Sequence, residues 1–508
     1  MLSAMFVGRM PTVPLSRQST FLVQFYPHGS DPMIHRIEKE QSESTRDLRP
    51  ELVPDLVTRR KGDKVLFVHP SRPRWILIND SAAELAERFD GVRSLRELAE
   101  DVVQETGAPS ELVLSDLENL VGALYKRGFL QSAEERAARG RPFSISGVFV
   151  RVTDACNLRC TQCYADSFGS LKSKKDELTT EEIHEVLREI RDLGGRTVTF
   201  SGGEPLLRPD MLDIAEFARN ELGFSVKLNT NGTLLLPEGV VERLVPIVDE
   251  LQISFDGSSA EIHDAVRGKG SFESSMRGAK KFIEAGGQDS LILCLTLMSS
   301  NIGSALEMPS LAKSVGARTV RYLNVVNDGR AVGTWAETFR PTDEQLIEFY
   351  DVLYFGELDT AGVRIMSGLQ GFFPQIPEDF RNECFLCPVA MSPCVSPQGK
   401  VYPCSMFERP HFLMGSIRDE GGIRSVVESG RLQGVREDLG QRPKLISECS
   451  QCDWRGLCQS GCAGTVDMAN GSTRHPDGFC QVRDHLYSRL IFEESGKGND
   501  PVECSCVE

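Results

Sequence analysis

The sequence predicts an α/β protein built around a partial (β/α)6 barrel, with a winged-helix-like domain before it and a cysteine-rich domain after it. Three observations lead to this prediction. Strand-like runs and amphipathic helical segments alternate about six times between 148 and 331. Short strands precede three helices between 51 and 132, and from 384 onward cysteine, proline and glycine replace regular periodicity. A chain of 508 residues is also too long for one hydrophobic core.

The domain boundaries follow from these changes in pattern. We expect a poorly ordered N-terminal extension, the winged-helix-like domain, a charged linker, the barrel, a helical bridge, the cysteine-rich domain and a C-terminal tail. Their predicted ranges are, in that order, 1–50, 51–132, 133–147, 148–335, 336–383, 384–485 and 486–508. Translation can start at Met1 or at Met33, and the sequence leaves both open.

Composition indicates a folded protein of a reducing compartment. Hydrophobic residues make up 40% and charged residues 26% of the chain, and no apolar run approaches the roughly 20 residues that span a bilayer. The net charge of -16 argues against nucleic acid as the main partner. Fifteen cysteines without a recognisable signal peptide favour metal ligation over disulfides. We therefore expect a cytoplasmic protein with no membrane segment.

The winged-helix-like domain opens with a hairpin signal. Lys64–Val68 and Trp75–Ile78 are strand-like, and a proline-containing turn separates them. Three helices are expected next: one over 82–89 capped within Asn79-Asp80-Ser81, one capped by Ser94 and one capped by Ser115.

The barrel elements follow in order. The predicted strands are 148–152, 197–200, 226–228, 250–255, 291–297 and 320–323, and the predicted helices are 180–193, 209–222, 271–285 and about 303–315. Parallel strands joined by helices bring their carboxyl ends to one rim, where the active sites of such folds lie. Cys294, inside the fifth strand-like run, is interpreted as a small buried side chain.

The first cysteine group directly follows the first barrel strand. Cys156, Cys160 and Cys163 have the spacing CxxxCxxC, which lets one loop surround one metal centre. A 4Fe-4S cubane needs four ligands, so three thiolates leave one iron open. A structural zinc site is the alternative, but it needs a fourth protein ligand and no histidine lies nearby. Tyr164 adds an aromatic wall after the third cysteine.

This motif, with its following aromatic residue, resembles the hallmark of the radical S-adenosylmethionine (SAM) superfamily, and the resemblance covers about 148 to 331. It implies a 4Fe-4S cluster on the three cysteines, SAM on the open iron, and cleavage of SAM to a 5'-deoxyadenosyl radical that abstracts hydrogen. It also implies SAM-binding roles at the strand ends for Tyr164, Gly202, Gly203, Glu204, Asn231, Ser254 and Arg267. For Arg267 a solvated surface position is an equal alternative.

No residue is assigned as a general acid or base. Asp256, Tyr322, Asn324 and Arg330 lie near the predicted rim, and a structural role is the alternative for each of them.

The remaining cysteines form a second dense group. They are Cys384, Cys387, Cys394 and Cys404, then Cys449, Cys452, Cys458 and Cys462, then Cys480, with Cys504 and Cys506 in the tail left without a role. Eight or nine thiolates fill two complete cubanes, and zinc ribbons are the alternative.

This second pattern resembles the SPASM domain, the auxiliary-cluster extension of peptide-modifying radical SAM enzymes, over about 384 to 482. The resemblance implies two auxiliary 4Fe-4S clusters that move electrons. One would be held by Cys387, Cys394, Cys404 and Cys462, and the other by Cys449, Cys452, Cys458 and Cys480. Cys384 is an alternative to Cys387, and the sequence does not decide between them.

The N-terminal domain is the best indication of the substrate. A strand edge beside a helix can accept an extended peptide as an added strand. The domain resembles the RiPP recognition element, a PqqD-like domain, through Arg59-Arg60, 77–82, Phe89-Asp90-Gly91 and 124–130. The resemblance implies the leader of a ribosomal precursor peptide as partner. A DNA-binding winged helix has the same elements, but the acidic chain and the fusion to cluster domains favour a peptide.

Basic residues surround the predicted hairpin and would suit an acidic leader, although they are equally consistent with a solvated face. They are Arg59, Arg60, Lys61, Lys64, Arg72 and Arg74.

We therefore expect a radical SAM maturase that binds a leader peptide and oxidatively modifies the core peptide, through a thioether or a carbon-carbon crosslink. A low-potential donor such as ferredoxin or flavodoxin would supply electrons. The alternative is a radical SAM/SPASM enzyme that matures a folded protein or modifies a tetrapyrrole or other small molecule. The sequence does not identify the bond, the precursor or the oligomeric state.

Overall fold

The computed structural model describes residues 46–69, 75–131, 144–167, 176–356, 358, 360, 362–367 and 389–492. Contacts divide the chain into two compact units, Met1–Gly140 with Arg489–Pro501 and Arg141–Ser488 with Val502–Glu508, and each is described by itself. Within the described ranges, no helix combines the length and the apolar character needed to cross a membrane.

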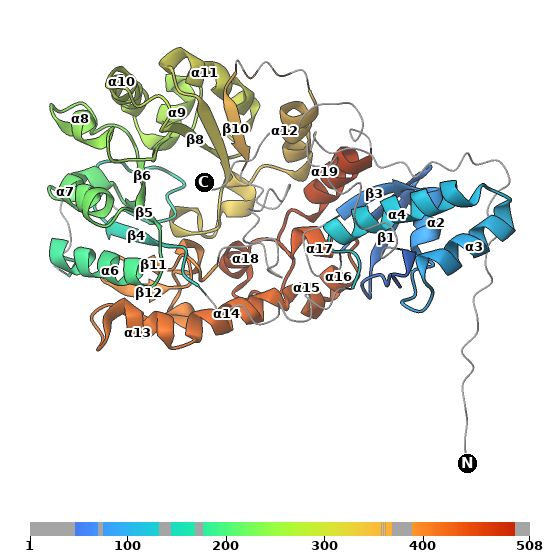
Figure 1. Ribbon diagram of the computed structural model, residues 1–508. Coiled ribbons are helices and arrows are strands. Elements are labelled where there is room, and N and C mark those ends of the chain that lie inside the picture. The colour runs from blue at the N-terminus through green and yellow to red at the C-terminus, as the bar shows by residue number, and fades with distance from the viewer. Residues whose placement is uncertain are drawn as a thin grey trace. The chain divides into compact units, whose positions relative to one another are not determined.

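The N-terminal unit contains a three-stranded antiparallel sheet and three helices (Figure 1). Strands β1 (Val57–Lys61), β2 (Lys64–Val68) and β3 (Trp75–Asn79) lie in the order β1-β2-β3. Helices α2 (Asp80–Ala86), α3 (Leu95–Thr106) and α4 (Ser110–Lys126) share one core with the sheet, which includes Phe67, Ile76, Leu98 and Leu117.

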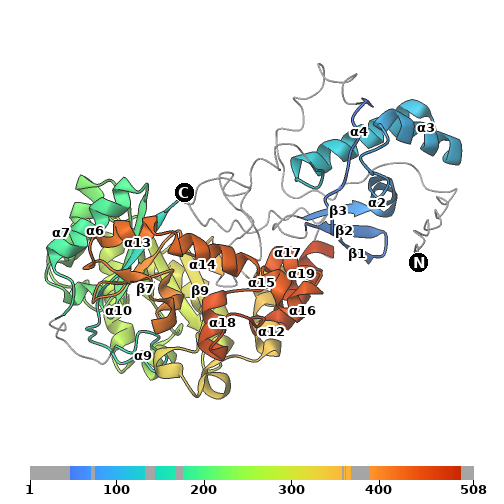
Figure 2. The same ribbon diagram turned by 90° about the horizontal axis from the view of Figure 1, so that it is seen from below.

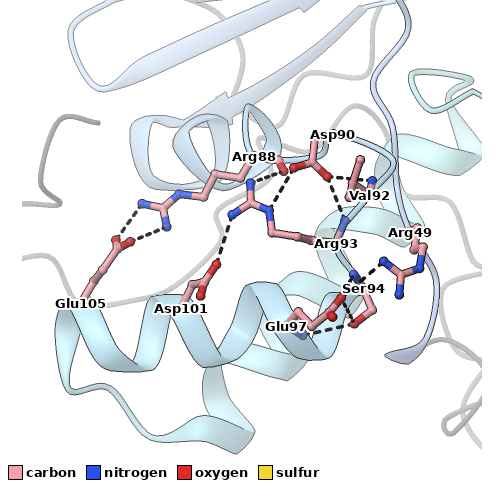
Figure 3. Close-up of polar contacts among 9 residues, drawn as sticks. All are labelled: Arg49, Arg88, Asp90, Val92, Arg93, Ser94, Glu97, Asp101 and Glu105. Carbon is pink, nitrogen blue, oxygen red and sulfur yellow. Dashed lines mark hydrogen bonds and ion pairs between the residues drawn. The ribbon is translucent and has the colours of Figure 1, made fainter. Parts of the chain in front are cut away.

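Polar contacts hold the turn between α2 and α3 (Figure 3). Asp90 accepts hydrogen bonds from two backbone amides of the turn and pairs with the Arg93 guanidinium at 3.0 Å. Arg93 also reaches Asp101 on α3 at 3.1 Å. Ser94 and Glu97 form a capping box at the start of α3. These contacts fix the angle at which α3 leaves the turn.

Two predicted helix caps of this unit are confirmed and two details were wrong. Asn79 accepts from the Ala82 amide at 3.0 Å, and Ser94 caps α3. The sheet has three strands rather than two, because β1 is polar along most of its length and gives no apolar alternation. Helix α4 begins at Ser110 after Pro109, not after Ser115, because its buried stripe starts at Val113.

One ten-stranded sheet runs through the second unit, in the order β10-β9-β8-β7-β6-β5-β4-β11-β12-β13 (Figures 1 and 2). Its strands are β4 (Gly147–Thr153), β5 (Thr197–Gly202), β6 (Ser225–Thr230), β7 (Glu250–Ser254), β8 (Leu291–Leu297), β9 (Thr319–Asn324), β10 (Arg364–Ser367), β11 (Cys394–Val395), β12 (Lys400–Tyr402) and β13 (Gly415–Ser416). Strands β4 to β9 pair in parallel in chain order, which confirms the predicted partial barrel.

Helices connect the parallel strands and cover their outer face (Figure 1). They are α6 (Thr180–Asp192), α7 (Met211–Glu216), α8 (Val240–Leu244), α9 (Ala260–Arg267), α10 (Ser271–Glu284) and α11 (Met308–Val315), followed by α12 (Asp343–Phe355). In α6 the apolar residues Ile183, Val186, Leu187 and Ile190 recur at helical spacing and are buried. The carboxyl ends of the strands therefore share one rim.

The cysteine-rich region continues the barrel sheet. Strand β11 pairs in parallel with β4, with Cys394 opposite Phe149, and β12 and β13 add antiparallel strands. Helices α13 (Gly422–Glu428), α14 (Arg431–Gly440), α15 (Arg442–Leu445), α16 (Ser447–Ser450), α17 (Arg455–Cys458), α18 (Ala463–Asn470) and α19 (Cys480–Phe492) follow. Strand β4 thus leads into the first cysteine loop at its end and borders the second cysteine region along its edge.

The segment predicted as a helical bridge contains a strand as well as a helix. Helix α12 lies where it is expected, but β10 pairs in parallel with β9 and extends the sheet beyond six strands. The strand has four residues, of which Ile365 and Met366 are buried, too short a run to give a periodic signal.

Candidate functional site

The first cysteine loop lies between β4 and α6, at the carboxyl end of β4. Cys156 and Cys160 are each 8% exposed, and Cys163 is half-buried. Burial raises the pKa of the Cys156 thiol to about 11, and the neighbouring Cys160 and Cys163 raise it further. Burial also raises the pKa of Cys160. Cys156 and Cys160 are therefore protonated without metal, so binding a cluster must release their protons.

The donor set of this loop fits a cluster better than a single ion. In the described ranges, no group of three or more His, Cys, Asp or Glu side chains is arranged to hold one metal ion. A cubane differs from a single ion because its thiolates bind separate irons. Three thiols on one loop, two of them buried and one half-buried, suit that arrangement, and the individual ligands stay predictions.

The loop after β9 fastens the cysteine loop from one side. Arg330 donates from Nε to the Cys160 carbonyl at 2.7 Å and from Nη1 to the Ser167 carbonyl at 2.8 Å. Its backbone amide binds the Cys163 carbonyl at 3.1 Å. Gly329 precedes it with φ 55°, and a Cβ there would collide with the same Cys163 carbonyl. Arg330, predicted only to lie near the rim, is thus a support of the cysteine loop.

A buried polar network fastens the loop from the other side. The Asp256 carboxylate, 0% exposed, accepts from Arg267 Nε at 2.7 Å and from Gln162 Nε2 at 2.6 Å. Arg267 Nη1 lies 3.9 Å from Cys160 Sγ. Arg267 was predicted either to approach SAM or to be solvated, and its side chain is only 11% exposed, which excludes the solvated alternative. Its observed partners are a carboxylate and a cysteine sulfur.

Glu204 is a buried carboxylate that hydrogen-bonds to the end of β6. It is 0% exposed and accepts from the Thr230 hydroxyl and the Asn231 amide, both at 2.7 Å. Burial raises its pKa. These bonds hold the end of β6, and the SAM-binding role expected for Glu204 stays a prediction.

Two predicted glycines allow β5 to approach the cysteine loop. Gly202 has φ 134°, and a Cβ on it would collide with the Thr153 carbonyl. A Cβ on Gly203 would collide with the Ala155 carbonyl. Backbone bonds of 2.8 and 2.7 Å join Gly203 to Thr153 and Glu204 to Ala155. The two glycines therefore serve close backbone packing at the start of the cysteine loop.

Asn231 and Ser254 lie at the ends of β6 and β7. Asn231 Nδ2 donates to Asn157 Oδ1 at 2.8 Å, and Asn157 Nδ2 donates to Thr233 Oγ1 at 2.8 Å, which ties the cysteine loop to the β6 end. Ser254 is half-buried at the end of β7, in register with Cys294 on β8. Cys294 is 4% exposed, and burial raises its pKa to about 12, as expected for an inert buried thiol.

A second network joins Tyr164 to the cysteine-rich region from β11 to α19, called the auxiliary region below. Arg151, on β4, donates to Glu408 at 2.5 Å and to Asp154 at 2.9 Å. Glu408 lies 3.2 Å from the sulfur of Cys394. The Arg151 charge lowers the pKa of Tyr164, although burial raises it more. Arg151 and Glu408 were not predicted, because their partners are far apart in the sequence.

The auxiliary cysteines lie on short elements that follow one another closely. Cys394 starts β11, Cys404 precedes a 3-10 turn, Cys449 lies in α16, Cys458 ends α17, Cys462 precedes α18 and Cys480 starts α19. Cys452 lies between α16 and α17. Cys384, Cys387, Cys504 and Cys506 lie outside the described residues.

Burial raises the pKa of the Cys458 thiol to about 11 and that of the Cys480 thiol to about 12. The Asp477 charge raises both pKa values further and the Arg483 charge lowers them, while Cys449 and Cys452 also raise the pKa of Cys458. A donor set made of sulfur alone fits iron-sulfur clusters.

Family comparisons agree with the geometry. The radical SAM superfamily model matches residues 150–302, the coenzyme PQQ synthesis protein D (PqqD) model matches 65–130, and the SPASM iron-sulfur cluster-binding domain model matches 387–453.

Curated relatives cover about two thirds of the chain. Mycofactocin maturase MftC of Mycobacterium ulcerans is 30% identical over 337 residues, 65% of this chain and 86% of that protein. The AdoMet-dependent heme synthase of Nitratidesulfovibrio vulgaris is 31% identical over 348 residues, 65% of this chain and 91% of that protein.

Solved structures share the fold. Native anSMEcpe with bound AdoMet and a peptide superposes with a TM-score of 0.56 at 19% identity, over 70% of this chain and all of that one. Streptococcus suis SuiB bound to its precursor peptide SuiA gives a TM-score of 0.53 at 14% identity, over 85% of this chain and all of that one.

The cysteine loop at the β4 end, the three matching family models and the 30% identity to a maturase over 86% of its length lead to one conclusion. The chain belongs to the radical SAM superfamily, as an enzyme that uses SAM with a 4Fe-4S cluster and carries auxiliary iron-sulfur clusters in a SPASM domain, preceded by a PqqD-like domain.

Proposed function

We propose that the enzyme binds the leader of a ribosomally synthesised precursor peptide and oxidatively modifies its core. The observation that carries this proposal is the presence of a PqqD-like domain, 65–130, on the same chain as the radical SAM and SPASM domains. Two similar proteins support it: a mycofactocin maturase is 30% identical, and SuiB, of the same fold, has been solved with its precursor peptide.

The N-terminal sheet suits recognition through the peptide backbone. Its outer strands are β1 and β3, and an extended leader can add to an outer strand by main-chain hydrogen bonds. Attraction by the basic residues contributes less than their number suggests, because Arg60 already pairs with Asp80 at 2.5 Å and with Glu87 at 3.0 Å. Arg72 and Arg74 lie outside the described residues. Main-chain pairing is thus the proposed basis of leader affinity.

One face of the barrel strands suits a polar substrate. Along β5 to β7, Val226, Leu228, Leu251 and Ile253 are fully buried on the helix-covered face. The alternating positions Thr199, Asn229, Gln252 and Ser254 are half-buried and polar. These side chains offer hydrogen bonds to a peptide at the rim where the cysteine loop lies.

Bound SAM and its cluster would supply a 5'-deoxyadenosyl radical that abstracts hydrogen from a core residue. The chain's own groups hold the cysteine loop: Arg330 through its carbonyls, and Arg267 with Asp256 through Cys160 and Gln162. Forming a thioether or carbon-carbon bond would then remove a second hydrogen as a proton and an electron, and the auxiliary clusters, when held by their cysteines, would supply the acceptor for that electron. The product is lighter than the substrate by two hydrogens.

An electron donor and a cellular location complete the proposal. A ferredoxin or flavodoxin supplies the low-potential electron that SAM cleavage requires. The buried thiol ligands favour a reducing, cytoplasmic location, because thiols are kept reduced there.

The test is an anaerobic reconstitution with dithionite, SAM and short peptides encoded beside the gene, followed by mass spectrometry. The proposal predicts 5'-deoxyadenosine and a peptide that has lost two hydrogens, with binding that depends on the leader. Formation of 5'-deoxyadenosine without leader binding or a change in peptide mass would contradict it.

A second candidate is modification of a tetrapyrrole, because an AdoMet-dependent heme synthase is 31% identical. The same assay distinguishes the two: a porphyrin substrate consumed with SAM, in the absence of any peptide, would favour this candidate.

A further inference from the structure

Arg442, the first residue of α15, is the largest of the fully buried side chains in the described part of the chain. Its guanidinium binds four backbone carbonyls. Nε donates to Thr473 at 2.8 Å and Nη1 to Gly461 at 2.8 Å. Nη2 donates to Ser460 at 3.0 Å and to His475 at 3.2 Å. A single cation therefore joins α15 to two loops of the auxiliary region.

The carbonyls at Ser460 and Gly461 belong to an unusual turn between two predicted cluster ligands. Gln459, Ser460 and Gly461 have φ values of 52°, 63° and 68°, so three consecutive residues are left-handed. Two of them are not glycine, and such residues rarely adopt this conformation. Cys458 precedes the turn and Cys462 follows it. Arg442 thus stabilises a strained turn that sets the relative positions of two sulfurs.

No carboxylate pairs with Arg442 among the described residues. Asp477, the nearest acidic group that acts on it, has its carboxylate bonded to Arg483. Carbonyl dipoles carry only partial charge, and a buried cation without an anionic partner is costly. Burial accordingly lowers the pKa of Arg442. The protein without clusters leaves this charge uncompensated.

The thiolates of the auxiliary cysteines are the groups that can supply negative charge opposite Arg442. Ser460 and Gly461, whose carbonyls accept from Arg442 at 3.0 and 2.8 Å, lie between Cys458 and Cys462 in the sequence, so the guanidinium lies beside the loop that joins these two predicted ligands. The charges of Cys462, Cys449 and Cys458 also act on Arg442. A cubane with four thiolates carries a net negative charge, and one-electron reduction makes it more negative. A nearby buried cation favours the reduced form, because the low dielectric leaves their attraction unscreened.

Other buried arginines near cysteines do not have this property. Arg483, 6% exposed, is paired with Asp477, and Arg267 is paired with Asp256. The charge of each is cancelled locally. Arg442 is distinguished from both by its uncompensated charge.

We propose that Arg442 is the counter-cation of the auxiliary clusters: a positioning residue that holds the turn between Cys458 and Cys462 and, through its charge, raises the reduction potential of the adjacent cluster. In the redox step the cluster accepts one electron from a reductant such as dithionite, and Arg442 changes neither bond nor proton. The proposal concerns the clusters alone and is independent of the peptide substrate.

The test compares two substitutions, Arg442→Met and Arg442→Lys, in the full chain. Lysine retains the charge with fewer donors, and methionine retains bulk without charge. Both are made in a background with Cys156→Ala, Cys160→Ala and Cys163→Ala, so that only auxiliary clusters give a signal. After anaerobic reconstitution, iron and sulfide are counted and the clusters are titrated by electron paramagnetic resonance against ambient potential.

Arg442→Met should lower the potential, so that at fixed ambient potential the ratio of reduced to oxidised cluster falls at least tenfold, equivalent to about 59 mV for a one-electron couple. Arg442→Lys should stay close to the parent. Arg431→Met is the matched control, because this exposed arginine of the neighbouring α14 also donates to a backbone carbonyl, that of Met414 at 2.9 Å. Its solvated charge should leave the potential unchanged.

Every outcome decides the proposal. If Arg442→Met loses the clusters while Arg442→Lys binds them at the parent potential, the charge is needed and the proposal stands. The proposal is overturned if Arg442→Met keeps the parent potential. It is also overturned if the reduction potential of Arg442→Lys falls as far as that of Arg442→Met, or if both variants lose their clusters. In these last two cases the fork geometry of the guanidinium would matter rather than its charge.

Discussion

The two cysteine regions of the second unit are surrounded by opposite charge arrangements. At the first, the buried cation Arg267 is matched by the buried carboxylate Asp256 at 2.7 Å. At the second, Arg442 binds only carbonyls. In the first region Asp256 neutralises the buried charge of Arg267 before any cluster binds. In the second region only bound clusters balance the charge of Arg442. We therefore expect the first loop to keep its shape without iron and the second to depend on iron.

The two regions also differ in how the backbone is held. Side chains from the ends of β6, β7 and β9 hold the first loop, and Asn231, Asp256 and Arg330 are the main contributors. The second depends on a left-handed turn and one arginine. Loss of a single contact should therefore disturb the backbone of the second region more than that of the first, which several side chains hold.

The largest expected effect follows from Asp256→Asn. The substitution leaves Arg267 as a buried cation without its partner, and breaking such a pair costs about 3 to 5 kcal/mol. The melting temperature should fall and iron should be lost from the first region, measured as slower SAM cleavage and fewer irons per chain. Asp213→Asn is the control, since Asp213 is 65% exposed and its pair with Arg243 is worth at most about 1 kcal/mol. Equal effects of the two substitutions would refute the charge comparison.

Two glycine substitutions should separate the regions. Gly203→Ala places a methyl group against the Ala155 carbonyl, and Gly461→Ala places one against the Asp477 carboxylate at φ 68°. Overpacking of this kind costs about 1 to 3 kcal/mol. Gly203→Ala should remove the first cluster and Gly461→Ala an auxiliary cluster, as resolved by electron paramagnetic resonance.

Gly303→Ala is the control for both, because open space surrounds that position. If either glycine variant removed all clusters equally, the two regions would not be independent.

A smaller effect concerns pH at the first region. His263 is fully buried between Phe255 and Phe272, and neither ring nitrogen has a hydrogen-bond partner among the described residues. Burial, reinforced by the Arg267 charge, lowers its pKa from 6.5 to about 4, while Asp256 and Asp264 oppose the shift. The unfolded chain therefore binds a proton at pH values where the folded chain does not.

Stability should accordingly fall as pH drops from 6.5 toward 4, by up to about 1.4 kcal/mol per pH unit. Between pH 6.5 and 5.5 the denaturation midpoint of the parent should decrease more than that of His263→Leu. His475→Leu, at an exposed position, should behave as the parent. A parallel pH dependence of His263→Leu and the parent would show that His263 is not responsible.

The smallest effect tests whether the regions are coupled. Arg409, beside Glu408 in the auxiliary region, pairs with Asp328 at 2.9 Å, and Asp328 directly precedes the loop that holds Cys163. Because both side chains are partly exposed, a double-mutant cycle of Asp328→Asn and Arg409→Met should give a coupling energy of about 1 kcal/mol or less. A much larger value would mean that the two regions act as one.

The sequence predicted the elements whose signals are local. The parallel strands follow from apolar runs separated by amphipathic helices, and the capping residues Ser94 and Asn79 act as predicted. Motif spacing likewise identified the first cysteine loop and the glycines that bring β5 against it.

The contacts that fasten the site could not be predicted, because they join residues far apart in the chain. Gln162 and Asp256 are 94 positions apart, and Arg151 and Glu408 are 257 apart. Each of these residues is an ordinary polar residue in the sequence. The same holds for Glu204, which accepts hydrogen bonds from Thr230 and Asn231 at the end of the next strand, 26 and 27 positions away. A buried arginine such as Arg442 gives no signal in composition or periodicity.

The most direct test of the account is SAM cleavage by the reconstituted parent, Cys163→Ala and Cys458→Ala, measured as 5'-deoxyadenosine after reduction with dithionite. We expect the parent to cleave SAM and Cys163→Ala not to cleave it. Cys458→Ala should still cleave SAM but should not modify the peptide. Cleavage by Cys163→Ala, or its complete loss in Cys458→Ala, would contradict the assignment of SAM chemistry to the loop at the end of β4 and of electron transfer to the SPASM domain.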